Sequence, residues 1–239
     1  MLISINLLVT NSVKLIEHLI KGLDEFCHSV SQDSVTFPIL TSHSLYDLER
    51  IVNRINQEEH YHAYLNQLKD DKIGKIFGII DYFYDSYKLL YTSLEKRQMY
   101  DFEQKKRFVD SVASIANMTS KGLYLLKKSN QKDTEIFKQL NIVLLAYNQE
   151  LKESPLNLIK VQETLIKPIL DIYLEFRYEK LPFDFDEIGD KASETNKMLS
   201  PIRLNNQNVS EMVKSYSDDF KENLKKLHDF SMPLNDYLA

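Results

Sequence analysis

Two Glu-x-x-His motifs come closest to metal chemistry in this sequence: Glu25 with His28, and Glu59 with His62. Residues three apart share one face of a helix, where a carboxylate and an imidazole can hold a transition metal between helices. The first pair falls opposite the apolar stripe of its helix, and no glutamates on two further helices are placed to bridge metal ions. We therefore assign no metal site and no cofactor, and keep Glu59 and His62 as the candidate ligands.

Arg54 and His60 form a second motif, an arginine and a histidine in the pattern R-x5-H. This pattern resembles the short arginine and histidine motif of the HEPN ribonucleases, which are all-α and often dimeric. The resemblance implies that Arg54 binds the scissile phosphate and that His60 acts as a general base on the 2'-hydroxyl. On an ideal helix the two side chains lie about 120° apart, so they converge only if the helix breaks between them or a dimer forms.

An acidic segment, Asp184, Asp186, Gly189 and Asp190, resembles the first half of a calcium-binding loop. In that register Ile188 stands where an oxygen ligand is needed. An acidic turn is therefore the interpretation we adopt for this segment.

Composition excludes several other classes of function. The net charge of −5 provides no excess positive field to attract nucleic acid, and the densest basic run, Lys105 to Arg107, is expected on a solvated helix face. The 5 glycines form no phosphate-binding loop. Cys27 is the single cysteine, so no internal disulfide is possible and a reducing cytoplasm is expected. We find no signal peptide or transmembrane helix; export by a dedicated secretion machine stays open.

Apolar residues recur at three- and four-residue steps along most of the chain, which predicts amphipathic helices. Ser44 and Asn208 are expected N-caps, a Ser154-Pro155 pair is expected to open a helix, and Pro168 predicts a kink in the preceding turn. Polar residues 56–60 either break the second helix or mark a change of its packing partner. The expected helices span about 12–30, 44–68, 73–94, 101–128, 136–151, 155–176 and 208–230.

These helices predict an all-α fold, an elongated bundle of about six to eight mostly antiparallel amphipathic helices. Residues 1–180 are expected to form the main bundle. Residues 181–207 are expected to be a weakly structured linker or a short helix that ends before Pro201, because proline disfavours helical geometry in the residue before it. Residues 208–239 are expected to form a long helix that packs on the bundle, giving one domain overall.

The lack of a complete catalytic set favours a non-enzymatic protein–protein interaction module of the adaptor, scaffold or effector type, which binds another protein or itself. Two features motivate this interpretation: the apolar face of the second helix reverses between Ile55 and Tyr61, and the last helix could dock or be donated. The alternatives are a HEPN-like ribonuclease and a membrane-active helical toxin subunit. In the latter, residues 73–94 would insert, although their four charged side chains make insertion costly. We expect no nucleic-acid partner and no membrane span.

Overall fold

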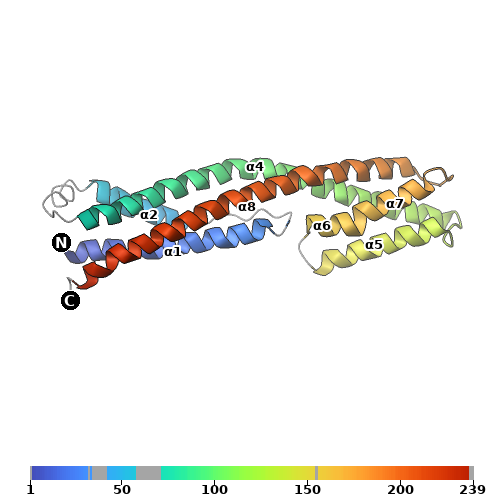
Figure 1. The fold of residues 1–239 in the computed structure, drawn as a ribbon. Helices are drawn as coiled ribbons and strands as arrows, with labels where there is room; N and C mark the ends of the chain where they lie inside the picture. The colour runs from blue at the N-terminus through green and yellow to red at the C-terminus, as the bar shows by residue number, and fades with distance from the viewer. Residues whose placement is uncertain (1, 32, 34–41, 58–70, 154–155, 237–239) are drawn as a thin grey trace. The chain divides into compact units, whose positions relative to one another are not determined.

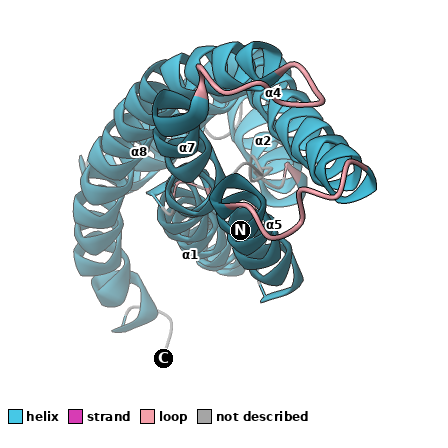
Figure 2. Cartoon of the chain, turned by 90° about the vertical axis from the view of Figure 1, so that its right-hand side faces the viewer, coloured by secondary structure: helices cyan, strands magenta, loops and turns pink. Residues whose placement is uncertain are grey.

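A computed structural model of the chain describes residues 2–31, 33, 42–57, 71–153 and 156–236. These residues form helices joined by turns, without a strand, which confirms the predicted all-α bundle; Figure 2 shows the helices and their connecting loops. No helix within the described ranges is both long enough and apolar enough to cross a bilayer. The α-helices, labelled in Figure 1, are α1 (Leu2–Ser31), α2 (His43–Gln57), α4 (Asp71–Lys128), α5 (Glu135–Glu153), α6 (Leu158–Val161), α7 (Lys167–Phe176) and α8 (Phe185–Asp236). A π-helical turn, η1 (Gln162–Ile166), joins α6 to α7.

The chain divides into two compact units. Unit 1 comprises Met1–His28, Pro38–Arg97 and Val209–Ala239, and unit 2 comprises Ser29–Phe37 and Gln98–Asn208. Helices α4 and α8 each contribute residues to both units.

Unit 1 packs α1, α2, the first part of α4 and the last part of α8 around a core that is rich in aromatic rings. The rings of Phe83 and Phe220 lie 4.4 Å apart between centroids, and Tyr87 lies 5.8 Å from Phe83. Polar contacts at the edge tie α1 to α8, because Asp24 accepts hydrogen bonds from Ser217 at 2.7 Å and Lys221 at 2.8 Å.

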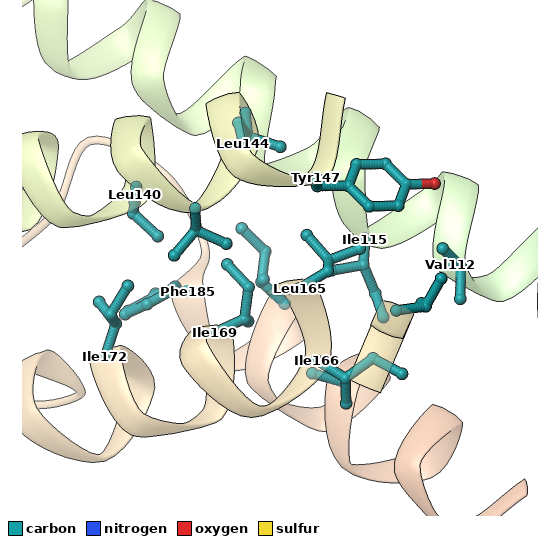
Figure 3. Packing of buried hydrophobic residues seen from close by; sticks show 14 of the residues in the cluster. Val112, Ile115, Leu140, Leu144, Tyr147, Leu165, Ile166, Ile169, Ile172 and Phe185 are labelled. Atoms are coloured by element: carbon teal, nitrogen blue, oxygen red, sulfur yellow. The ribbon is translucent and has the colours of Figure 1, made fainter. Parts of the chain in front are cut away.

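Unit 2 has an aliphatic core contributed by α4, α5, the α6–η1–α7 segment and α8. Figure 3 shows Leu140, Leu144 and Tyr147 of α5 in one cluster with Leu165 and Ile169. The π-helical turn η1 ends two residues before Pro168, in the turn where the sequence predicts a kink.

The α6–η1–α7 segment begins at Leu158, and Asn157 is its N-cap. The predicted start at Ser154-Pro155 is therefore wrong. Residues 154 and 155 themselves lie outside the described residues.

Helix α4 runs without a break through the residues that separate the predicted helices 73–94 and 101–128. The prediction of two helices is therefore wrong here. Lys96 and Arg97 resemble the C-terminal turn of a helix by charge, yet both are good helix formers and no glycine or proline follows them directly. The helix ends at Lys128, where Asn130 has a φ of 61°. The Gln131 and Asn130 amides donate to Leu126 and Lys127 in the pattern of a Schellman motif.

Helix α8 is also continuous, and the expected helix end before Pro201 is wrong. A proline inside a helix costs about 3 kcal/mol or more, so its neighbours must stabilise the helix. Leu199 and Ile202 are both buried on either side of Pro201. Asn208, the predicted N-cap, lies inside α8, and Ser44 lies inside α2, which begins at His43.

Candidate functional site

The two sequence motifs for ribonuclease and metal chemistry are not assembled by the described residues. Arg54 is exposed on α2, and its predicted partner His60 lies outside the described residues, as do Glu59 and His62. Glu25 and His28 are exposed on α1, and Glu25 lies 3.8 Å from the Lys21 ammonium. Among the described residues, no group of three or more His, Cys, Asp or Glu side chains could hold a metal ion.

The acidic segment that resembles half of a calcium loop is the start of α8. Asp184 precedes the helix, and its Oδ1 accepts a hydrogen bond from the Glu187 amide at 3.1 Å. This is the N-cap arrangement, in which a side-chain oxygen satisfies a free amide of the first turn. Ile188 is buried in the core of unit 2, so it faces away from any loop that could receive an ion.

A buried polar cluster occupies unit 2 where the sequence predicts a solvated face. Lys105 is only 3% exposed and Asp101 only 4%, whereas Lys106 and Arg107 are exposed. The expectation of a solvated basic run is therefore wrong for Lys105. The Asn205 side-chain amide donates to Asp101 Oδ1.

A cavity of about 110 Å³ adjoins this cluster, lined by Asp101, Gln104, Lys105, Pro201, Ile202 and Asn205. Burial lowers the pKa of Lys105, while the carboxylates of Asp101 and Asp33 partly oppose that shift. Arg203 lies 3.5 Å from Asp33. Asp101 and Lys105, the two charged residues that line the cavity, balance each other, so the cavity presents no net charge with which to select an ionic ligand.

The spacing of buried residues along α4 predicts that Lys105 is buried, although its charge suggests that it is exposed. The buried stripe of α4 in this unit includes Phe108, Val112 and Ile115. Extended towards the N-terminus by three and then four residues, the same stripe passes through Lys105 and Asp101. Helical periodicity therefore places both side chains on the buried face.

An exposed apolar surface lies on α5, on the side opposite the core. Ile142 is 64% exposed and Leu145 is 61% exposed. On an ideal helix Ile142 points about 160° and Leu145 about 140° from Leu140, which is buried in the core shown in Figure 3. Lys138 and Gln149 continue the same face. We call Lys138, Ile142, Leu145, Gln149 and Lys152 the outer face of α5.

A second cavity, of about 180 Å³, lies in unit 1 between α2 and α4. Tyr84, Lys88, Tyr91 and Glu95 form a row along α4 at helical spacing and line the cavity. Leu45, Tyr46 and Glu49 line it from α2, Ser42 lines it just before α2, and Thr92 lines it from α4. We call this space the tyrosine cavity.

One carboxylate of the tyrosine cavity, that of Glu49, already has hydrogen-bond partners within the protein. The Tyr84 hydroxyl donates to Glu49 Oε1 at 2.6 Å, and the Lys88 ammonium donates to the same oxygen at 3.1 Å. These hydrogen bonds, Tyr84 first, lower the pKa of Glu49. The Lys88 ammonium also lies 5.1 Å from the centroid of the Tyr84 ring. The cavity wall thus already holds one cation against a carboxylate and a tyrosine.

No family model, curated protein or solved structure matches this chain.

Proposed function

We propose that the chain is a non-enzymatic helical protein–protein interaction module, and that the outer face of α5 is its binding surface. The observation that carries this proposal is the exposure of Ile142 and Leu145 on the same side of one helix. Side chains three apart on a helix are neighbours and form one apolar patch. Apolar anchors at this spacing are typical of a helix that lays one face into a groove of its partner.

The charged residues beside the apolar patch indicate which kind of partner surface would complement it. Lys138 and Lys152 continue the outer face at either end of Ile142 and Leu145, and both ammonium groups are exposed. A partner with an apolar groove and carboxylates at its rim would complement this pattern. The partner is another protein or a second copy of the chain, in a reducing cytoplasm.

The two sequence features that first suggested an interaction role support this proposal less than the outer face of α5 does. Tyr61, one end of the predicted face reversal, lies outside the described residues. Helix α8 is continuous from Phe185 to Asp236, so it offers no linker from which a C-terminal helix could be donated. The outer face of α5 therefore carries the proposal alone.

The double substitution Ile142→Gln with Leu145→Gln tests this surface, because glutamine keeps helix propensity and removes the apolar contact. Sedimentation velocity measures self-association, and crosslinking in extracts of the native host followed by mass spectrometry measures binding to other proteins. We expect the wild-type chain to form one such complex, and the double variant to lose it while circular dichroism stays unchanged.

Leu174→Gln is the matched control, since Leu174 is a similarly exposed leucine on α7. The control should keep the complex. A complex that survives in the α5 variant, or a wild-type chain that is monomeric and yields no crosslinked partner, would contradict the proposal.

A further inference from the structure

The tyrosine cavity contains a carboxylate that the protein itself does not neutralise. Glu95 lines the cavity at its exposed edge. Within the described part of the chain, no cationic side chain pairs with it. Glu49, the other carboxylate of the cavity, is already bonded to Lys88 and Tyr84. The two glutamates and one lysine that line the cavity leave one net negative charge.

Two aromatic rings lie beside this carboxylate. Tyr91 stands one helical turn before Glu95 on α4, and Tyr46 lines the cavity from α2 with 58% of its surface exposed. A cation over the face of a tyrosine is attracted by the ring, and the attraction grows when a carboxylate lies nearby. The cavity already holds one cation with groups of these types: the Lys88 ammonium donates to Glu49 Oε1 at 3.1 Å and to the Tyr84 hydroxyl at 2.8 Å.

We infer that the tyrosine cavity is a binding site for the guanidinium group of an arginine side chain on a partner protein. Glu95 accepts hydrogen bonds from the guanidinium, and Tyr46 and Tyr91 contact its planar faces. A volume of about 180 Å³ accommodates the group, since a water molecule takes about 30 Å³ in the liquid. Guanidinium is favoured over ammonium because it is planar, stacks on rings and is less strongly hydrated.

This site belongs to unit 1 and the outer face of α5 belongs to unit 2, so the two proposals can fail separately. The α5 double variant should bind arginine as the wild type does.

The test uses Nα-acetyl-arginine amide, whose only charge is on the guanidinium, and Nα-acetyl-citrulline amide, its uncharged analogue. The ring signals of labelled tyrosine, assigned with Tyr→Phe variants, report binding by NMR. We expect saturable shifts of Tyr46 and Tyr91 with the arginine compound and none with citrulline. Glu95→Gln should weaken binding about threefold or more, in the range for loss of one exposed ion pair, and Tyr46→Leu should weaken it by a similar factor.

Glu175→Gln is the matched control, because it removes the same charge from an exposed position on α7. It should leave arginine binding unchanged. Equal shifts with citrulline, or an unchanged affinity in Glu95→Gln, would overturn the site. Tighter binding of Nα-acetyl-lysine amide than of the arginine compound would overturn the choice of guanidinium.

Discussion

Gly189 on α8 lies against the face of the Tyr173 ring on α7, so closely that a Cβ atom at position 189 would come within 2.5 Å of Tyr173 Cγ. The tyrosine is held in this position by its other contacts. Its hydroxyl donates to Asp186 at 3.0 Å, and its ring meets Phe185 edge to face at 5.6 Å. Glycine is thus required here by the close approach of the two helices.

Gly189→Ala should therefore destabilise the protein. Alanine gains up to about 1 kcal/mol of helix propensity over glycine, but a new methyl group in a packed interior costs about 1–3 kcal/mol. We expect a net loss of about 1 kcal/mol in the free energy of unfolding, measured by urea denaturation. Gly78→Ala is the control: its Cβ would meet nothing within 4 Å, so it should stabilise. A stabilised Gly189→Ala variant would show that the helices move apart at no cost.

The sequence predicts the helices of this protein well and their ends poorly, for a physical reason. Burial of every third or fourth residue produces a periodic pattern that reads directly as a helix. Helix ends depend instead on local signals that tertiary packing overrides. Pro201 predicts an end, yet α8 continues because Leu199 and Ile202 are buried on either side of it. Lys96 and Arg97 predict an end, yet α4 continues because both residues favour helix.

The candidate surfaces were harder to predict because they depend on which helices pack together. Sequence periodicity identifies the buried face of α5, but the exposure of Ile142 and Leu145 follows only when no described helix covers them. Likewise, the tyrosines of α4 fit a core stripe equally well. Their role as a cavity wall arises from the placement of Tyr46 and Glu49 on α2.

Asp81→Asn should stabilise the protein at neutral pH. Burial, followed by repulsion from Asp85, raises the pKa of Asp81. The folded state therefore holds this proton more tightly than the unfolded chain, whose aspartates titrate near about 3.9. As the pH rises through that value, ionisation costs the folded state stability. The gain from Asp81→Asn should appear at pH 7 and vanish well below the unfolded pKa.

Urea denaturation at several pH values measures this effect. Asp85→Asn should give a smaller gain, because it removes the repulsion but leaves the burial of Asp81 unchanged. A gain that is equally large at pH 3 and pH 7 would show that ionisation of Asp81 is not its cause.

The buried pair of charged residues on α4 supports a prediction of opposite sign. Lys105→Met should destabilise the protein by about 3 kcal/mol, because the buried Asp101 carboxylate loses a compensating cation. Adding Asp101→Asn should restore most of the loss, since asparagine carries no charge and keeps an acceptor for the Asn205 amide. Urea denaturation of both single variants and the double variant gives the coupling free energy.

Lys106→Met is the matched control, since Lys106 is the exposed neighbour on the same helix. It should change the free energy of unfolding by no more than about 0.5 kcal/mol. A Lys105→Met variant as stable as Lys106→Met would mean that Asp101 does not depend on the lysine, and that the ammonium contributes nothing to the fold.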